Sequence, residues 1–299
     1  MYIYPPIDYI EPVFRPPSEA NSLILQVTNG CSWNNCTFCE MYTEPQKKFR
    51  PKSQADILDD IKRCAESLGT VRRVFLADGD AMALSFNRLK GILLAIKEHL
   101  PSVTRVSSYC LPRNLKKKTV EELAELQSLG LSLLYVGAES GNDQILAKID
   151  KGETFDSTVD ALLKIKAAGI KSSVMIINGM GGVNYSEQHA LDSARLVNET
   201  QPEYLATLVL FFRQGEAHFR KEFGDDFIKS SQLQLIQEMQ VLLSNLELEK
   251  TIFRSDHASN YLVLKGVLGR DKAKLLSMID GAINQDRSVF LRSDRQRGL

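Results

Sequence analysis

Apolar residues follow two alternating patterns along most of this chain. Short runs rich in Val, Ile, Leu and aromatic residues are typical of buried strands, and the longer segments between them repeat apolar residues at the spacing of an amphipathic helix. The predicted strands are residues 23–28, 73–77, 105–110, 133–137, 173–177 and 205–211. The predicted helices are residues 53–68, 85–100, 119–129, 142–149, 155–168, 186–200, 230–246 and 272–286. Six strand–helix units in regular order imply a parallel sheet with right-handed crossovers, so we expect an α/β fold, a partial (β/α)6 barrel.

The two ends of the chain differ from this repeating centre. Residues 1–21 contain five of the ten prolines, and proline disfavours helix at its own position and at the position before it. We therefore predict an extended arm at residues 1–21 that lies over the surface. The core domain is predicted at residues 22–215, and a C-terminal extension at residues 216–299 is expected to pack on the barrel.

Polar and glycine-rich motifs follow four of the predicted strands directly. They are the nine residues from Cys31 to Cys39, Asp78-Gly79-Asp80, Glu139-Ser140-Gly141, and the run from Asn178 to Gly182. The carboxyl ends of parallel strands meet at one edge of a sheet, where barrel enzymes place their active sites. The four motifs are therefore predicted to contribute to a single site.

Three of the five cysteines, Cys31, Cys36 and Cys39, lie within nine residues. A structural zinc site is normally closed by four protein ligands, and no fourth Cys or His lies within ten residues of this loop. Iron–sulfur clusters also usually take four cysteines, so three predict a cluster with one iron open to a ligand from outside the protein. The remaining cysteines, Cys64 and Cys110, are predicted to be buried packing residues.

Charge and hydropathy exclude several classes of partner. Lys plus Arg and Asp plus Glu both number 37, and a balanced charge gives no long-range attraction to nucleic acid or to an anionic membrane. No apolar run is long enough to cross a bilayer, and the N-terminus lacks the pattern of a secretion signal. We therefore expect a cytoplasmic protein with no membrane partner, for which nucleic acid is an unfavoured substrate.

The cysteine loop resembles that of the radical S-adenosylmethionine (radical SAM) superfamily, in which three cysteines hold a [4Fe-4S] cluster and SAM chelates the fourth iron. It departs from the usual spacing in having four residues between the first two cysteines, while Phe38 stands at the usual aromatic position. The segment from Tyr135 to Gly152 closely resembles the strand-four region of the branch that contains Elp3-like, MiaB-like and HemN-like proteins. The resemblance covers roughly residues 22 to 215 strongly and the tail more loosely.

The resemblance implies roles for the other motifs. The turn at residues 78–80 looks like the counterpart of the Gly-Gly-Glu-type turn that holds the amino group of SAM, and the residues after strand four would contact its ribose or methionine part. Glycine after strand five would let the backbone approach adenine closely. The alternatives are a solvated turn and a surface carboxylate. The implied cofactor-binding residues are Phe38, Asp78, Gly79, Asp80, Glu139, Ser140, Asn178 and Gly179.

The tail offers candidate catalytic groups. Asp256 and His257 follow a strand-like run and could transfer protons at the barrel mouth; the alternative is a capping Asp beside a packed His. Arg213, after the sixth strand, is either an anchor for an anionic group or a surface residue. The other histidines, His99, His189 and His218, are predicted to face solvent.

The implied function is that of an enzyme. It would cleave SAM reductively to a 5′-deoxyadenosyl radical that abstracts hydrogen from a small-molecule substrate, with an electron donor such as flavodoxin or ferredoxin. Modification of RNA or protein is one alternative, and a non-enzymatic iron–sulfur redox or sensor protein is another. A basic stripe around the mouth would favour RNA, whereas an enclosed pocket would favour a small molecule.

Overall fold

The computed structural model describes residues 5–286 and 288–297, and the chain forms two compact units. The first unit comprises Met1–Asn34, Met41–Val136 and Leu163–Ser172, and the second comprises Asn35–Glu40, Gly137–Leu162 and Ser173–Leu299. The division runs through one strand, β6 (Leu131–Glu139), and one helix, α5 (Phe155–Ala167). Each unit is described by itself below.

The first unit is built on parallel strands. Its strands β1 (Leu23–Gln26), β4 (Arg73–Ala77), β5 (Arg105–Cys110) and the start of β6 are hydrogen-bonded in that order, all parallel. The row Leu25, Leu76, Ser108 and Leu134 crosses this sheet, and each of these residues is wholly buried. Burial on both faces explains why these strands read as nearly continuous apolar runs.

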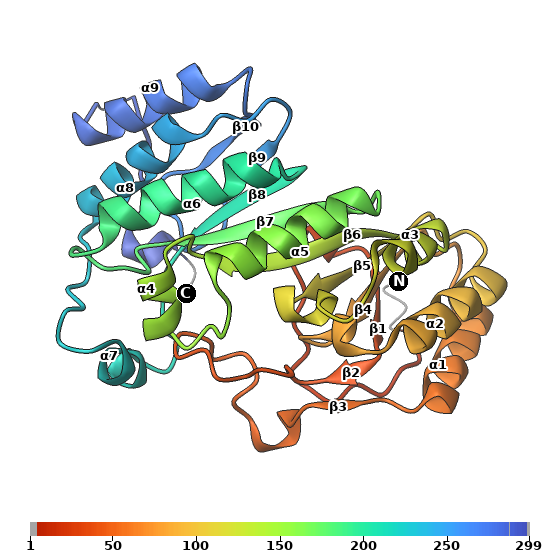
Figure 1. The fold of residues 1–299 in the computed structure, drawn as a ribbon. Coiled ribbons are helices and arrows are strands. Elements are labelled where there is room, and N and C mark those ends of the chain that lie inside the picture. The colour runs from red at the N-terminus through yellow and green to blue at the C-terminus, as the bar shows by residue number, and fades with distance from the viewer. Residues whose placement is uncertain (1–4, 287, 298–299) are drawn as a thin grey trace. The chain divides into compact units, whose positions relative to one another are not determined.

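Three helices pack side by side in the first unit, α1 (Gln54–Ser67), α2 (Phe86–His99) and α3 (Val120–Ser128) (Figure 1). The Ser53 hydroxyl caps α1 by accepting from Asp56 N, and Thr119 and Glu122 form a capping box at the start of α3. Cys64 on α1 and Cys110 at the end of β5 are buried, which confirms their predicted packing role.

The residues after β1 leave the main sheet. Thr28–Asn29 (β2) pairs with Arg50–Pro51 (β3) in a small antiparallel ladder, so the predicted strand 23–28 is split after Gln26. The cysteine loop thus starts from a strand pair rather than from the end of one long strand. Short 3-10 helices elsewhere in the chain span Pro17–Glu19, Pro45–Lys47, Ala81–Ala83, Pro112–Leu115 and Asp294–Gln296.

The N-terminal arm is docked in the first unit. Ile7 is buried, Tyr9 donates its phenolic proton to Ile24 O at 2.7 Å, and the ring of Phe14 lies edge-on to that of Tyr42. The arm is therefore docked as predicted, and its described residues lack a helix except at Pro17–Glu19, which form a 3-10 helix. The division of the chain into arm, core and extension remains a prediction.

The second unit continues the same architecture. Strands β7 (Lys171–Asn178), β8 (Tyr204–Val209) and β9 (Ile252–Ser255) are parallel neighbours, and β10 (Leu264–Val267) pairs with β9 antiparallel. The helices are α4 (Asp143–Lys148), α6 (Ser186–Thr200), α7 (Ala217–Phe223), α8 (Gln232–Asn245) and α9 (Lys272–Ile283). Helix α8 packs against both α6 and α9 (Figure 1). Within the described residues, no helix combines the length and the apolarity needed to cross a membrane.

Both units consist mainly of parallel strands with intervening helices, which confirms the α/β class. The predicted strand 205–211 ends earlier, at Val209, because the following residues form a loop. The strands β3 and β10, the helix α7 and the 3-10 helices were not predicted. All of them are short, and their local patterns are too brief to separate from a loop.

Candidate cofactor site

The cysteine loop begins in the first unit. Cys31 is half-buried and follows Gly30, whose φ of +70° is readily adopted only by glycine and whose missing Cβ leaves room for the carbonyl of Lys47. Two residues on, the guanidinium of Arg113 lies 3.7 Å from the centre of the Trp33 ring. This cation–π contact holds the start of the loop against the 3-10 helix after β5.

Asp80 joins the cysteine loop to the turn after β4. Its Oδ2 accepts hydrogen bonds from the backbone N and from the hydroxyl of Ser32, the residue after Cys31. The side chain is wholly buried, and Oδ1 has no hydrogen-bond partner within the described residues. Burial raises the pKa of Asp80, although hydrogen bonds from Ser32 and Asn114 act against that shift. Oδ1 of Asp80 is therefore a buried acceptor that a ligand could satisfy.

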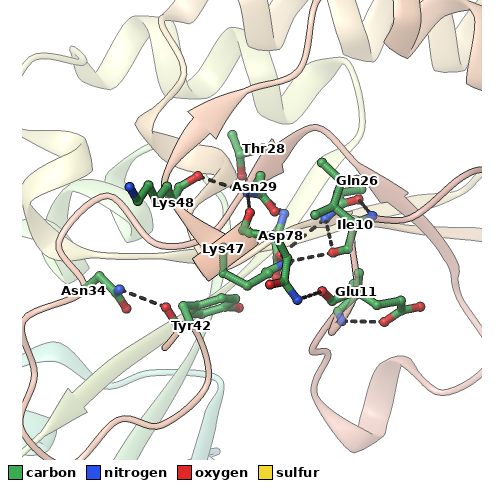
Figure 2. Close-up of polar contacts among 12 residues, drawn as sticks. Ile10, Glu11, Gln26, Thr28, Asn29, Asn34, Tyr42, Lys47, Lys48 and Asp78 are labelled. Carbon is green, nitrogen blue, oxygen red and sulfur yellow. Dashed lines mark hydrogen bonds and ion pairs between the residues drawn. The ribbon is translucent and has the colours of Figure 1, made fainter. Parts of the chain in front are cut away.

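Asp78, at the other end of the same turn, forms a buried ion pair with Lys47 (Figure 2). Gln26 also donates to its Oδ2, at 3.3 Å, while Lys47 donates to Ile10 O in the arm at 2.8 Å. Both charged side chains are fully buried, so each depends on the other for compensation. This carboxylate therefore balances Lys47 and ties down the arm. Its Oδ1 again has no partner in the described part of the chain.

Gly79 between them packs against the ring of Tyr42, which occupies the space that a Cβ would need. The turn thus presents two buried, unsatisfied carboxylate oxygens, one from Asp78 and one from Asp80. An ammonium group carries several donors and satisfies such acceptors well. These residues therefore fit the amino group of SAM, and that role remains a proposal.

Lys118 is a buried neighbour of this turn that sequence reasoning did not single out. Its ammonium donates to Met82 O at 2.8 Å and to Asn114 O at 3.1 Å. Burial lowers the pKa of Lys118, although the nearby Cys110 and Asp80 act to raise it. Its position as the last of three successive lysines suggests a solvated charge run, so the local sequence carries no sign of its burial.

The remaining two cysteines lie in the second unit. Cys36 and Cys39 are both half-buried, and Cys39 N donates to Cys36 O at 3.1 Å. Thr37 N donates to Ile149 O at 3.0 Å, while Phe38 packs on the apolar cluster around α4. In the residues that the structure describes, no three His, Cys, Asp or Glu side chains gather closely enough to enclose a metal ion. The ligand role of the cysteines therefore stays a prediction from their spacing.

Glu139 ends β6 at φ +65° and is nearly buried. Its Oε1 accepts from Lys151 Nζ at 2.9 Å, and Oε2 has no partner among the described residues. Burial alone would lower the pKa of Lys151, but the negative charges of Glu139, Cys36 and Cys39 raise it. Lys151 thus places a buried positive charge near both cysteines of this unit.

Ser140 is hydrogen-bonded within the protein. His189 Nε2 lies 3.0 Å from Ile177 O, which can only accept, so Nε2 carries the proton and Nδ1 accepts from the Ser140 hydroxyl at 2.8 Å. Ser140 Oγ in turn accepts from Asn142 N. Ser140 therefore already has two partners inside the protein. The prediction that His189 faces solvent was wrong: it is 1% exposed, because its side of α6 packs inward.

The turn after β7 is held by a residue that was missed, Glu238 on α8. Its Oε1 accepts from Asn178 Nδ2 and from Gly179 N, both at 2.6 Å, and its Oε2 accepts from the Ser186 hydroxyl at 2.6 Å. Glu238 is 4% exposed. The sequence did contain a sign of this role, because Glu238 is the single charged residue among the fourteen residues of α8.

A cavity of about 470 Å³ adjoins this turn. Its walls come from Gly179, from the loop after β8, from α8 and from the last described segment of the chain. Asn178 and Val209 are paired at the carboxyl ends of β7 and β8, so the cavity lies at the edge of the sheet where the site was predicted. Its volume falls within the roughly 300–1,000 Å³ of small-molecule pockets.

The predicted catalytic pair of the tail lies beside this cavity rather than in its walls. Asp256 pairs with Lys265 at 2.7 Å. The ring of His257 stacks on the cavity-lining Phe211, with centroids 6.0 Å apart, and its Nδ1 accepts from Ser259 N at 3.1 Å. Burial lowers the pKa of His257. Proton transfer by this pair remains a prediction.

Arg213 stands in the loop after β8. Its backbone N donates to a carboxylate oxygen of Glu40, the residue after Cys39, at 2.7 Å, and Gln214 N donates to the other oxygen at 3.0 Å. The Arg213 guanidinium lies 5.9 Å from the centre of the Phe211 ring. The end of the cysteine loop is therefore tied to the loop that lines the cavity, and the anchoring role of the Arg213 side chain remains a prediction.

Comparison with known protein families matches residues 25–194 to the Radical SAM superfamily. The chain belongs to the radical SAM superfamily. This radical SAM protein is 27% identical over 172 residues to the 4′-phospho-dehydrooxetanocin synthase of Priestia megaterium, covering 52% of this chain and 23% of that one. It is 22% identical over 220 residues to the tRNA-2-methylthio-N(6)-dimethylallyladenosine synthase of Desulforamulus reducens. That match covers 72% of this chain and 47% of the relative. The chain thus spans less than half the length of either relative.

Among solved structures, the radical SAM coproporphyrinogen III oxidase of Escherichia coli has a TM-score of 0.57 at 17% identity, covering 75% of this chain and 52% of that chain. This likeness confirms the partial-barrel fold. The family match confirms an enzyme of the radical SAM class that uses a [4Fe-4S] cluster and SAM. The match to a tRNA-2-methylthio-N(6)-dimethylallyladenosine synthase supports the predicted resemblance to MiaB-like proteins.

Proposed function

We propose that this radical SAM enzyme abstracts hydrogen from a small-molecule substrate. The observation that carries the proposal is the cavity of about 470 Å³ beside Gly179, at the carboxyl ends of β7 and β8. When bound, the cluster and SAM supply one-electron reductive cleavage of a SAM sulfur–carbon bond, which releases methionine and a 5′-deoxyadenosyl radical that takes a hydrogen atom from the substrate. A protein such as flavodoxin or ferredoxin would supply the electron.

The donor set supports a cluster and SAM. Thiolates of three cysteines, Cys31, Cys36 and Cys39, suit iron and leave one position for a ligand. In the first unit, the unpartnered oxygens of Asp78 and Asp80 suit an ammonium group. In the second unit, the unpartnered oxygen of Glu139 suits a ribose hydroxyl, because a carboxylate oxygen accepts from O–H.

Other side chains position these groups. Lys151 orients the carboxylate of Glu139 through its 2.9 Å ion pair, so the second oxygen keeps a fixed direction. Glu238 holds the backbone N–H of Gly179, which fixes the turn proposed to approach adenine. Neither residue needs to touch SAM, and each acts by restricting the geometry of one that does.

Modification of tRNA is the second candidate, since several curated relatives are named as tRNA-2-methylthio-N(6)-dimethylallyladenosine synthases. The net charge of zero supports the small molecule instead, because a tRNA substrate is usually met by a basic surface.

One experiment separates the two candidates. Reconstituted protein with SAM and reductant is expected to form 5′-deoxyadenosine slowly by itself and several-fold faster with the low-molecular-mass filtrate of a cell extract. Purified bulk tRNA, added in its place, is expected to leave the rate unchanged. Stimulation by tRNA and not by the filtrate would overturn the small-molecule proposal.

A further inference from the structure

The cavity next to Gly179 has an apolar side and a polar side. Phe212 and Phe227 line it together with Leu210 and Leu235. Its polar lining includes both basic and acidic side chains and two hydroxyls, those of Glu216, Lys229, Ser230, Tyr261, Asp294 and Arg297. The ligand that the cavity can bind depends on which of these charges are already neutralised within the protein.

Arg297 is a buried guanidinium with part of its hydrogen-bonding capacity unused. It is 8% exposed. Its Nε donates to Ser259 O at 2.7 Å, and its Nη1 donates to Tyr261 Oη at 2.5 Å and to Asp294 Oδ1 at 3.0 Å. These contacts use three of the five N–H donors of arginine. The two on Nη2 meet no acceptor in the described part of the chain, although Arg297 lines the cavity.

A second donor in the cavity wall is also unsatisfied. Ser230 is 9% exposed, and its hydroxyl has no hydrogen-bond partner among the described residues. A buried hydroxyl without a partner is costly, so a ligand acceptor at this position would be favourable. Both unsatisfied groups, the Arg297 edge and the Ser230 hydroxyl, can donate a proton to a ligand oxygen.

The acidic side chains of the cavity are already matched by cations. Glu216 pairs with Arg220 at 2.8 Å and with Lys229 at 3.6 Å. Asp294 is 82% exposed and accepts from Tyr261 and Arg297. Among the lining residues two cations, Lys229 and Arg297, therefore face two carboxylates, and Arg220, which lies outside the lining, also pairs with Glu216. The acidic groups are thus occupied, whereas Nη2 of Arg297 and the Ser230 hydroxyl remain as donors for a ligand.

We propose that this cavity binds a small organic anion, with its carboxylate or phosphate group on Arg297 and Ser230, assisted by Lys229, and its apolar body against Phe212 and Phe227. Arginine presents its donors in a planar fork that matches either anionic group. The proposal rests on the proposed function in one respect, that this anion is the substrate of the radical reaction.

Four probes of similar size test the charge that the cavity selects. Phenylacetate and phenyl phosphate are anions, phenylacetamide is the neutral counterpart, and 2-phenylethylamine is the cation. Titration calorimetry on the full-length reconstituted protein with SAM and no reductant is expected to show binding of at least one anion. The amide and the amine should bind about tenfold more weakly or not at all, since a hydrogen bond to a charged group contributes roughly 1.5–3 kcal/mol. Preference between the two anions identifies the group that the site takes.

Variants assign the binding to the proposed residues. Arg297→Gln is expected to weaken binding of the preferred anion about tenfold or more. Arg295→Gln is the matched control, because Arg295 is exposed in the 3-10 helix that directly precedes Arg297 and does not line the cavity. Lys229→Gln removes a 66% exposed side chain and keeps the test valid if Arg297→Gln does not fold. Lys229→Gln should weaken binding of the preferred anion two- to threefold.

Three outcomes would overturn the anion site. These are equal or tighter binding of the amide or amine, no binding of any probe, and unchanged anion affinity in folded Arg297→Gln and Lys229→Gln protein. Formation of 5′-deoxyadenosine by the wild-type protein is measured separately. If the anions bind but no 5′-deoxyadenosine forms, the proposed function fails while the anion site stands, so the two failures are distinguishable.

Discussion

At the residue scale, two buried carboxylates of this protein use only one of their oxygens in contacts within the described residues. Asp78 and Glu139 each give one oxygen to a buried lysine and keep the other without a partner in the described residues. A buried polar atom that is left unsatisfied costs about 1–3 kcal/mol. Such atoms in a native site therefore point to donors that a ligand supplies.

The first prediction concerns the spare oxygen of Glu139. In Glu139→Gln the amide oxygen can still accept from Lys151, but the second position becomes an NH2 group that cannot accept from a ribose hydroxyl. SAM affinity is expected to fall about tenfold or more, with the iron content unchanged. Titration calorimetry and an iron assay on one preparation measure both, with the exposed Glu121→Gln as control. Unaltered SAM affinity would remove Glu139 from the site.

The second prediction is a pH dependence carried by His257. Burial lowers its pKa below the ordinary value of 6.5, the charges of Arg213 and Arg292 act in the same direction, and Asp256 opposes them. Because the unfolded chain then binds the proton more readily, His257 contributes stability that is present above pH 6.5 and lost as the pH falls through the folded-state pKa.

Unfolding temperatures from pH 8 to pH 5 test this dependence. His257→Gln should lose stability less steeply than wild type below pH 6.5, while His99→Gln should follow the wild-type curve. Parallel curves for wild type and His257→Gln would contradict a buried neutral histidine at this position.

At the element scale, helix α8 connects the cavity with the proposed cofactor turn. Leu235 lines the cavity and lies 2.6 Å from where a Cβ on Gly179 would be, while Glu238, one turn later, holds the Gly179 N–H. Residues three and four apart share a helix face. One face of α8 therefore supports both the cavity wall and the turn after β7.

The third prediction tests that support. Glu238→Ala leaves the Gly179 N–H buried without its acceptor and leaves the Asn178 amide with Leu235 O alone, so both stability and SAM affinity should fall. Glu238→Gln should restore much of both, since its carbonyl oxygen can accept from the same two donors. Gln237→Ala changes an exposed residue of the same helix and serves as control. Lower stability with unaltered SAM affinity in folded Glu238→Ala would show that Glu238 has no positioning role.

The fourth prediction concerns the arm. Glu19 is buried and accepts from Ser22, Arg105 and Tyr135. Glu19→Ala should lower the free energy of unfolding by about 2–3 kcal/mol, less than the roughly 3–5 kcal/mol for a wholly buried pair, because the Arg105 side chain is 29% exposed. Urea unfolding measures the change, with the 75% exposed Glu98→Ala as control. A loss no larger than that of the control would mean that the arm is not anchored by Glu19.

At the scale of the whole molecule, the cysteine loop contributes residues to both compact units, with Cys31 in the first and Cys36 and Cys39 in the second. Cluster loading is expected to stabilise the folded chain, since a ligand that binds only the folded state favours it.

The fifth prediction is the cluster content. Anaerobic protein should hold about four irons and four sulfides per chain. Cys36→Ala should abolish this, whereas Cys64→Ala, which changes a buried packing residue, should not. Full iron and sulfide in Cys36→Ala, or zinc without sulfide in the wild type, would contradict the assignment.

Features with local causes could be read from the sequence. The apolar runs at 73–77 and 105–110 predicted β4 and β5 at their observed bounds. This was possible because the apolar residues of a buried strand are consecutive or alternating in the sequence itself. Ser53 likewise marks the start of α1 through a contact three residues away. The three cysteines, together with the segment from Tyr135 to Gly152, were sufficient to indicate the family, since both are short motifs of neighbouring residues.

The partners of the buried charges were decided only by tertiary structure. Lys47 meets Asp78 across 31 positions, and Glu238 meets Gly179 across 59. Lys118 and Arg297 resemble surface charges in the sequence and are buried in the fold. A local pattern records helix, strand and cap, because these depend on residues a few positions apart. The pairing and desolvation of a charge depend on which distant segments pack around it, and only the folded chain determines that.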